Sequence, residues 1–128
     1  MEGPSGQKKI LIVEDDKFVS ELYDHQFSKN GFTTKVAGDG EMALKLIKSE
    51  KFDAILLDIM IPKIDGVEVL KRLKADAKTK DIIVIVLSNL GQDELIKQAL
   101  QIGAKAYIIK SLYTPNQVLA ETKSILGL

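Results

Sequence analysis

The sequence predicts an α/β fold in which helices cover both faces of a parallel sheet of five strands. Five short apolar segments alternate along the chain with five segments whose apolar residues recur at helical spacing. The chain has 128 residues, of which 45% are hydrophobic and 28% charged, the usual size and balance of one globular domain. Each helix provides the right-handed crossover that consecutive parallel strands need.

The first two strands and helices are predicted from their apolar patterns. The continuous apolar run Lys9–Val13 is typical of a strand buried on both faces. Lys17–Asn30 has apolar residues at helical spacing, and Gly31 supplies the stop. Phe32–Ala37 mixes apolar and polar residues, as an edge strand does, and Met42–Ser49 has the pattern of a second helix.

The third strand and helix lie on either side of a loop that contains Pro62. Ala54–Asp58 is an apolar run that ends in an acid, which predicts another buried strand. Asp65 and Glu68 form a capping-box pair, so we expect a helix that begins there and runs to about Ala75.

The last two units have the clearest local signals. Asp81–Leu87 is rich in β-branched residues and is the strongest strand signal in the chain. A helix from about Gln92 should end at Gly103, and Ala106–Ile109 should form the fifth strand. Thr114–Gln117 combines an N-cap, a proline at the first helical position and a glutamine at the third, which predicts the start of a final helix.

Composition excludes several classes of protein. Lys plus Arg and Asp plus Glu number 18 each, so there is no basic field to attract nucleic acid or anionic lipid. Cysteine is absent, which excludes disulfides and thiolate metal sites. No apolar run approaches the roughly 20 residues that cross a bilayer. Residues 1–7 are typical of a disordered lead-in or a cloning remnant, and we expect one cytoplasmic domain over residues 8–128.

Acidic residues follow two of the predicted strands. The carboxyl ends of parallel strands share one edge of the sheet, where ligands bind. Glu14, Asp15 and Asp16 follow the first strand, and Asp58 ends the third. Crowded carboxylates repel one another, and Mg²⁺ relieves this repulsion because it prefers oxygen ligands. The alternative for Asp16 is that it caps the following helix. Capping does not explain why Asp58 ends an apolar strand.

A hydroxyl and an ammonium should face the same edge. Ser88 follows the fourth strand and Lys110 the fifth. These groups match the needs of a phosphoryl group, whose transfer depends on positioning and charge neutralisation. Taken singly, Ser88 is better explained as a turn residue and Lys110 as a surface charge. Their joint position opposite the acids favours a site for a metal together with a phosphate.

Four segments resemble the receiver domains of bacterial response regulators, and the similarity spans residues 8–128. They are Ile10–Asp16 (first-strand acids), Phe52–Gly66 (phosphoacceptor), Ile85–Ser88 (hydroxyl) and Gly103–Lys110 (lysine). The resemblance implies a two-component signalling protein like the stand-alone chemotaxis regulators. It also implies a flavodoxin-like, doubly wound (βα)5 three-layer sandwich with strand order 2-1-3-4-5.

The resemblance further implies a role for each site residue. Asp58 would accept a phosphoryl group from a phosphohistidine of a sensor histidine kinase or phosphotransfer protein, and Ser88 and Lys110 would bind the phosphoryl oxygens. The Mg²⁺ ligands would be Glu14, Asp15, Asp58 and the backbone carbonyl of Met60. Such a protein is a self-phosphorylating and slowly autodephosphorylating switch, not a conventional enzyme.

Tyr107 resembles the aromatic residue whose rotamer couples to Ser88 on phosphorylation. The switching surface would consist of the helix from about Gln92, the strand Ala106–Ile109 and the final helix, and an output protein of unknown identity would read it. The alternative for Tyr107 is a half-buried aromatic of an edge strand with no switching role. We expect no nucleic-acid or membrane partner.

Three departures from the family pattern lie at the predicted site. Ser111 replaces the usual proline after the lysine, so we expect a trans Lys110–Ser111 bond, an altered loop and an uncertain aim for Lys110. Asn89 replaces a small residue and either narrows access or adds an amide donor. Met60 and Leu90 occupy the two positions that flank the attacking water in the family, and both are apolar here. Apolar side chains do not orient water, so we expect slow hydrolysis of the aspartyl phosphate.

Alternative functions remain open at this point. A pseudo-receiver would keep the fold as an interaction module without phosphorylation. A Mg²⁺-dependent phosphohydrolase of the haloacid-dehalogenase type would need an aspartate where Met60 stands, and a flavin carrier would need a less acidic first loop. His25, the only histidine, should lie on the surface, and the lysine-rich stretch Lys71–Lys80 should be a solvated helix end and loop.

Overall fold

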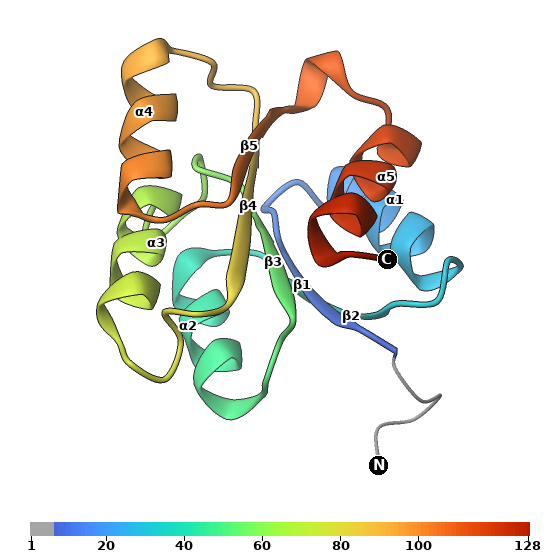
Figure 1. Cartoon of the computed structure of the whole chain (residues 1–128), viewed down its shortest axis with the longest axis horizontal. Helices are drawn as coiled ribbons and strands as arrows, with labels where there is room; N and C mark the ends of the chain where they lie inside the picture. The colour runs from blue at the N-terminus through green and yellow to red at the C-terminus, as the bar shows by residue number, and fades with distance from the viewer. Residues whose placement is uncertain (1–6) are drawn as a thin grey trace.

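A central parallel sheet separates two layers of helices in the computed structural model, which describes residues 7–128 (Figure 1). One face is covered by α2, α3 and α4, and the other by α1 and α5. The elements follow in the order β1 (Lys9–Val13), α1 (Lys17–Ser28), β2 (Thr33–Ala37), α2 (Gly40–Ser49), β3 (Ala54–Leu57), α3 (Gly66–Ala75), β4 (Ile83–Ser88), α4 (Asp93–Ile102), β5 (Ala106–Ile109), the 3₁₀ turn η1 (Lys110–Leu112) and α5 (Pro115–Leu126).

The strand order is β2-β1-β3-β4-β5 and every neighbouring pair is parallel, which confirms the predicted topology. This order places β1 beside β3 in the middle of the sheet, although the helix α1, the strand β2 and the helix α2 separate them in sequence. Val13 is in register with Leu57, so the residues that follow these two strands leave the sheet at the same level. The order therefore brings the acids after β1 to the acid after β3.

Two apolar cores hold the layers together. The first packs one face of the sheet against α2, α3 and α4, and the second packs the other face against α1 and α5. Alternate residues of β1 serve alternate cores, Leu11 and Val13 in the first and Ile10 and Ile12 in the second. All four are at most 1% exposed. Burial on both faces explains why the central strands read as continuous apolar runs.

Most predicted boundaries are correct to within two residues. The helix α1 ends at Ser28, not Asn30, and the chain then turns through Gly31 with a φ of 93°. The helix α2 begins two residues before the predicted Met42, because the Asp39 carboxylate caps it by accepting from the Met42 N–H at 2.7 Å. A single capping side chain thus shifts a helix start that the apolar periodicity cannot locate.

The caps agree with the sequence at two helices and differ in part at a third. Asp16 caps α1, and the reciprocal capping box of Thr114 and Gln117 opens α5 as predicted. Asp65 caps α3 by accepting from the Glu68 N–H at 3.0 Å. The Glu68 carboxylate, however, accepts from Arg72 Nε at 3.0 Å, so the predicted box is formed on one side only.

Two predictions concern side chains on the outer surface, and they have different outcomes. His25 is exposed on α1, as expected. Lys74 corrects the picture of a fully solvated Lys71–Lys80, because its Nζ donates to the carbonyls of Lys80 and Ile82, both at 2.8 Å. Within the part of the chain that the structure describes, no helix is long and apolar enough to span a membrane. The prediction for residues 1–7 lies outside the described residues, apart from Gln7.

Candidate functional site

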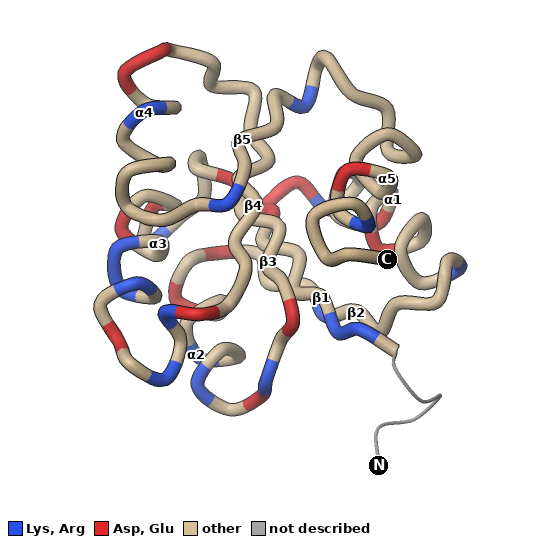
Figure 2. The backbone as a smooth tube through the Cα atoms, viewed as in Figure 1, with Lys and Arg blue, Asp and Glu red and all other residues tan. Residues whose placement is uncertain are grey.

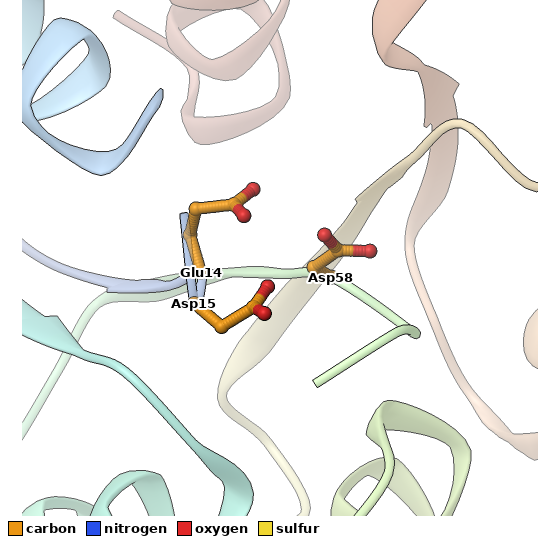
Figure 3. Close-up of side chains that lie close together, drawn as sticks. All are labelled: Glu14, Asp15 and Asp58. Carbon is orange, nitrogen blue, oxygen red and sulfur yellow. The ribbon is translucent and has the colours of Figure 1, made fainter. Parts of the chain in front are cut away.

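Three carboxylates meet at the carboxyl edge of the sheet (Figure 3). Glu14 and Asp15 follow β1 and Asp58 follows β3, and one oxygen of each lies within 4.8 Å of the other two. Glu14 and Asp58 are only 5% and 6% exposed, whereas Asp15 is open to solvent. Carboxylates at this separation repel one another strongly where water is partly excluded. The predicted convergence of acids is present.

Lys110 is aimed directly into this cluster from the end of β5. Its Nζ donates to Asp58 Oδ2 at 2.8 Å and also to Glu14 Oε1, and its side chain is 14% exposed. Burial opposes the ammonium charge, but the hydrogen bonds to Asp58 and Glu14 outweigh it and raise the pKa of Lys110. Burial also raises the pKa of the Glu14 carboxyl. One cation is therefore shared between two buried acids.

The backbone around Asp58 is fixed from two directions. The Met60 N–H donates to Asp58 Oδ1 at 3.2 Å, so the two carboxylate oxygens have different partners. The start of α3 packs so closely that a Cβ on Gly66 would lie 2.2 Å from the Asp58 carbonyl oxygen. Only glycine permits this approach. The Met60 side chain points outward and is 63% exposed.

Ser88 and Tyr107 are linked through the same residue after β4. Ser88 is buried, and its Oγ accepts from the Leu90 N–H at 3.2 Å. Tyr107 is half-buried, and its hydroxyl donates to the Leu90 carbonyl. Burial raises the pKa of the Tyr107 phenol. The two predicted switch residues therefore bind the N–H and the carbonyl of the same residue, Leu90.

The loop after β5 adopts the conformation that the missing proline predicts. The described residues contain no cis peptide bond, so Lys110–Ser111 is trans, and Lys110–Leu112 form a 3₁₀ turn. The Ser111 N–H donates to Asn89 Oδ1 at 2.9 Å. Asn89 thus acts as an acceptor here, a role that the sequence reasoning missed. One sequence signal pointed to this contact. Asn89 and Ser111 both depart from the family pattern, and they follow the neighbouring strands β4 and β5.

The site opens beside a groove of about 560 Å³ whose lining includes Asp15, Met60 and Leu90. A larger hollow of about 870 Å³ lies at the opposite, amino edge of the sheet, between the segments that precede β3 and β4. Asp15, one of the three clustered carboxylates, lines the smaller opening. We therefore assign the functional site by its chemistry rather than by volume.

Comparison with known proteins settles the family. The sequence profile of the response regulator receiver domain matches residues 10–123. This chain is a response-regulator receiver domain. Receiver domains of this family are signalling switches, generally not conventional enzymes; they bind Mg²⁺ at an acidic pocket and interact with histidine kinases or phosphotransfer proteins.

Relatives of this receiver domain occur in proteins of two sizes. It is 36% identical over 119 residues to the alkaline phosphatase synthesis transcriptional regulatory protein PhoP of Bacillus subtilis, covering 93% of this chain and 48% of PhoP. It is 36% identical over 103 residues to sporulation initiation phosphotransferase F of the same organism, covering 80% of this chain and 82% of that protein. The chain thus spans about half the length of curated relatives such as PhoP.

The solved structures agree on the fold. The BeF3-activated N-terminal receiver domain of Klebsiella pneumoniae RstA superposes with a TM-score of 0.85 at 32% identity, over 94% of this chain and 99% of that one. The receiver domain therefore has a CheY-type, flavodoxin-like architecture.

Proposed function

We propose that this receiver domain is a phosphoacceptor switch in which Asp58 takes a phosphoryl group from a histidine kinase or phosphotransfer protein. One observation carries the proposal. The Asp58 carboxylate is almost fully buried, yet it lies within reach of two further acids and of the Lys110 ammonium. A structural core does not need such a group, whereas a reactive carboxylate does.

Two hydrogen-bond donors, one side chain and one backbone N–H, orient Asp58 for attack in this proposal. Lys110 holds one oxygen and the Met60 N–H the other, which fixes the plane of the carboxylate. An Asp58 oxygen forms a bond to phosphorus while the bond from phosphorus to the donor imidazole nitrogen breaks, and the donor histidine leaves as a neutral imidazole after taking up a proton. Lys110 neutralises charge on the transferring group.

The acids fit a hard divalent cation. Glu14, Asp15 and Asp58 provide the carboxylate oxygens that Mg²⁺ prefers, and the backbone carbonyl of Met60 is proposed as a further ligand. When bound, Mg²⁺ supplies charge neutralisation for the phosphoryl oxygens. Lys110 alone leaves the cluster with an excess of negative charge, because the three carboxylates have one ammonium beside them, which binds Glu14 and Asp58.

The response to phosphorylation follows from the contacts of Ser88 and Tyr107. A new dianionic group attracts the Ser88 hydroxyl and the Lys110 ammonium. Ser88 then gives up its contact with the Leu90 N–H, and the segment that Tyr107 holds by its carbonyl moves. The surface formed by α4, β5 and α5 changes with it and is read by an output protein.

The lifetime of the aspartyl phosphate is set by Met60 and Leu90. Both line the groove beside Asp15, and neither side chain can orient water for attack. We expect slow hydrolysis. The double replacement Met60→Asn and Leu90→Glu should shorten the lifetime by about tenfold or more. Loss of phosphoryl mass with time measures it, and an unchanged lifetime would contradict this assignment.

The test of the proposal is the intact mass after incubation with acetyl phosphate and Mg²⁺. The wild-type protein should gain one phosphoryl group, and Asp58→Asn should gain none. A wild-type protein that gains nothing, even from a phosphorylated histidine donor, is a pseudo-receiver. Continuous release of inorganic phosphate at many turnovers would instead indicate a phosphohydrolase.

A further inference from the structure

A hydrogen bond joins the segment after β4 to the turn after β5. The Ser111 N–H donates to Asn89 Oδ1 at 2.9 Å, across 22 positions of sequence. Both residues are exposed, so apolar packing does not fix either of them. This contact is also the only side-chain hydrogen bond recorded for Asn89 or Ser111 among residues 7–128.

The donor of this bond depends on the identity of residue 111. A proline there has no N–H and could not reach Asn89 in this way. Proline also disfavours helical backbone angles in the residue before it, whereas Lys110 begins a 3₁₀ turn. The turn that this chain adopts therefore requires a residue other than proline at position 111, and Asn89 provides the acceptor that holds it.

Lys110 is the residue that this turn must place. Its ammonium has to reach Asp58 Oδ2 at 2.8 Å from the end of a long side chain with many rotamers. The Asn89 bond lies on the very next peptide, so it restricts the backbone from which the Lys110 side chain extends. Tyr107 adds a second tie between β5 and the same segment, through the Leu90 carbonyl.

We propose that Asn89 is a positioning residue, which through the Ser111 N–H holds the 3₁₀ turn so that Lys110 engages Asp58 and Glu14. Its effect on phosphoryl transfer rests on the proposed function, whereas its effect on the turn does not. Among residues 7–128, the Asn89 side chain hydrogen-bonds the Ser111 N–H and none of the acids. It acts through Lys110.

The test compares Asn89→Leu, which has no acceptor, with Asn89→Asp, which keeps one. Gln92→Leu is the matched control, because Gln92 is exposed in the same loop and makes no capping hydrogen bond. Amide hydrogen exchange at Ser111 should accelerate in Asn89→Leu and stay slow in Asn89→Asp and Gln92→Leu. With acetyl phosphate, Asn89→Leu should be phosphorylated roughly tenfold or more slowly, with Asn89→Asp recovering most of the rate.

Combination with Lys110→Ala shows whether Asn89 acts through the lysine. In the Lys110→Ala background, Asn89→Leu should slow phosphorylation no further, and the two changes should be non-additive in the free energy of unfolding. Full additivity in both measurements, unchanged Ser111 exchange, or a wild-type phosphorylation rate in Asn89→Leu would each overturn the inference. If the wild type accepts no phosphoryl group, the proposed function fails, and exchange and unfolding still decide the role of Asn89.

Discussion

Lysines pair with carboxylates at both edges of the sheet, but in opposite settings. At the carboxyl edge, Lys110 lies between Glu14 and Asp58, with side chains only 14%, 6% and 7% exposed. At the amino edge, Lys9 and Lys35 flank Glu50, with side chains 29%, 50% and 23% exposed. Figure 2 shows acidic residues where β1 runs toward α1 and basic residues on the β1–β2 side near the N-terminus.

The difference lies in both burial and stoichiometry. At the amino edge two ammonium groups share one carboxylate in contact with water, and Lys9 also lies 5.2 Å from the centre of the Phe52 ring. Ion pairs exposed in this way contribute little to the free energy of unfolding, and they leave no excess negative charge that requires a further cation. At the carboxyl edge two buried acids share one ammonium, and the exposed Asp15 carboxylate lies beside them, which is costly unless a cation joins the three acids. The same residue types therefore form a solvated ion pair at one edge and a crowded acidic cluster, our proposed functional site, at the other.

The largest expected contrast is between Lys110→Ala and Lys9→Ala. Without Mg²⁺, loss of Lys110 leaves two buried carboxylates unpaired and should lower the free energy of unfolding by about 3–5 kcal/mol. Loss of Lys9 should cost about 1 kcal/mol or less. Urea unfolding of both variants measures the contrast. Equal losses would show that the two edges do not differ as described.

A smaller contrast concerns the response to the cation. Asp15→Asn removes one of the three acids without disturbing the core, because Asp15 is exposed. It should change the unfolding free energy by less than about 1 kcal/mol in the absence of Mg²⁺. We expect Mg²⁺ to raise the melting temperature of the wild type and expect Asp15→Asn to lose most of this increase, because stabilisation by a ligand falls with its affinity. Asp53→Asn, at the amino edge, is the control and should keep the full response.

The smallest expected effect is a pH dependence at the amino edge. The hydrogen bond from Lys9, together with the charge of Lys35, lowers the pKa of Glu50 below its ordinary value of 4.5. A lowered pKa means that the ionised pair stabilises the fold above pH 4.5 and that this stabilisation disappears as the pH falls through the folded-state pKa. Glu50→Gln should therefore be slightly less stable than wild type at pH 7 and equal to it in strong acid. If the stability difference between wild type and Glu50→Gln grew on acidification, the Glu50 pKa would be shifted in the opposite direction.

The alternation of strands and helices and the meeting of the acids were predictable from periodicity and the shared edge of a parallel sheet, whereas the strand order came from the family resemblance. Buried runs identify the central strands, and the shared carboxyl edge brings Glu14 and Asp58 together. The start of α2 at Gly40 was not predictable in this way, because a single Asp39 hydrogen bond decides it.

Apolar periodicity does not predict contacts between loops. The bond between Asn89 and Ser111 depends on the path of two turns, and no apolar pattern encodes such a path. The same holds for Lys74, whose ammonium folds back onto two carbonyls instead of extending into solvent. Without the usual proline, the sequence left open where the Lys110 side chain points. The structure shows that the Lys110–Ser111 bond is trans and that the Lys110 ammonium reaches Asp58.

The most direct test of the central claim is a titration with Mg²⁺ alone, followed through the backbone amide signals of the protein. The crowded acids should bind the cation, so the signals of Glu14, Asp15 and Met60 should shift and saturate, while those of Lys9 and Glu50 stay in place. Shifts of equal size at both edges, or none at the carboxyl edge, would contradict the claim that buried negative charge at this edge creates the site.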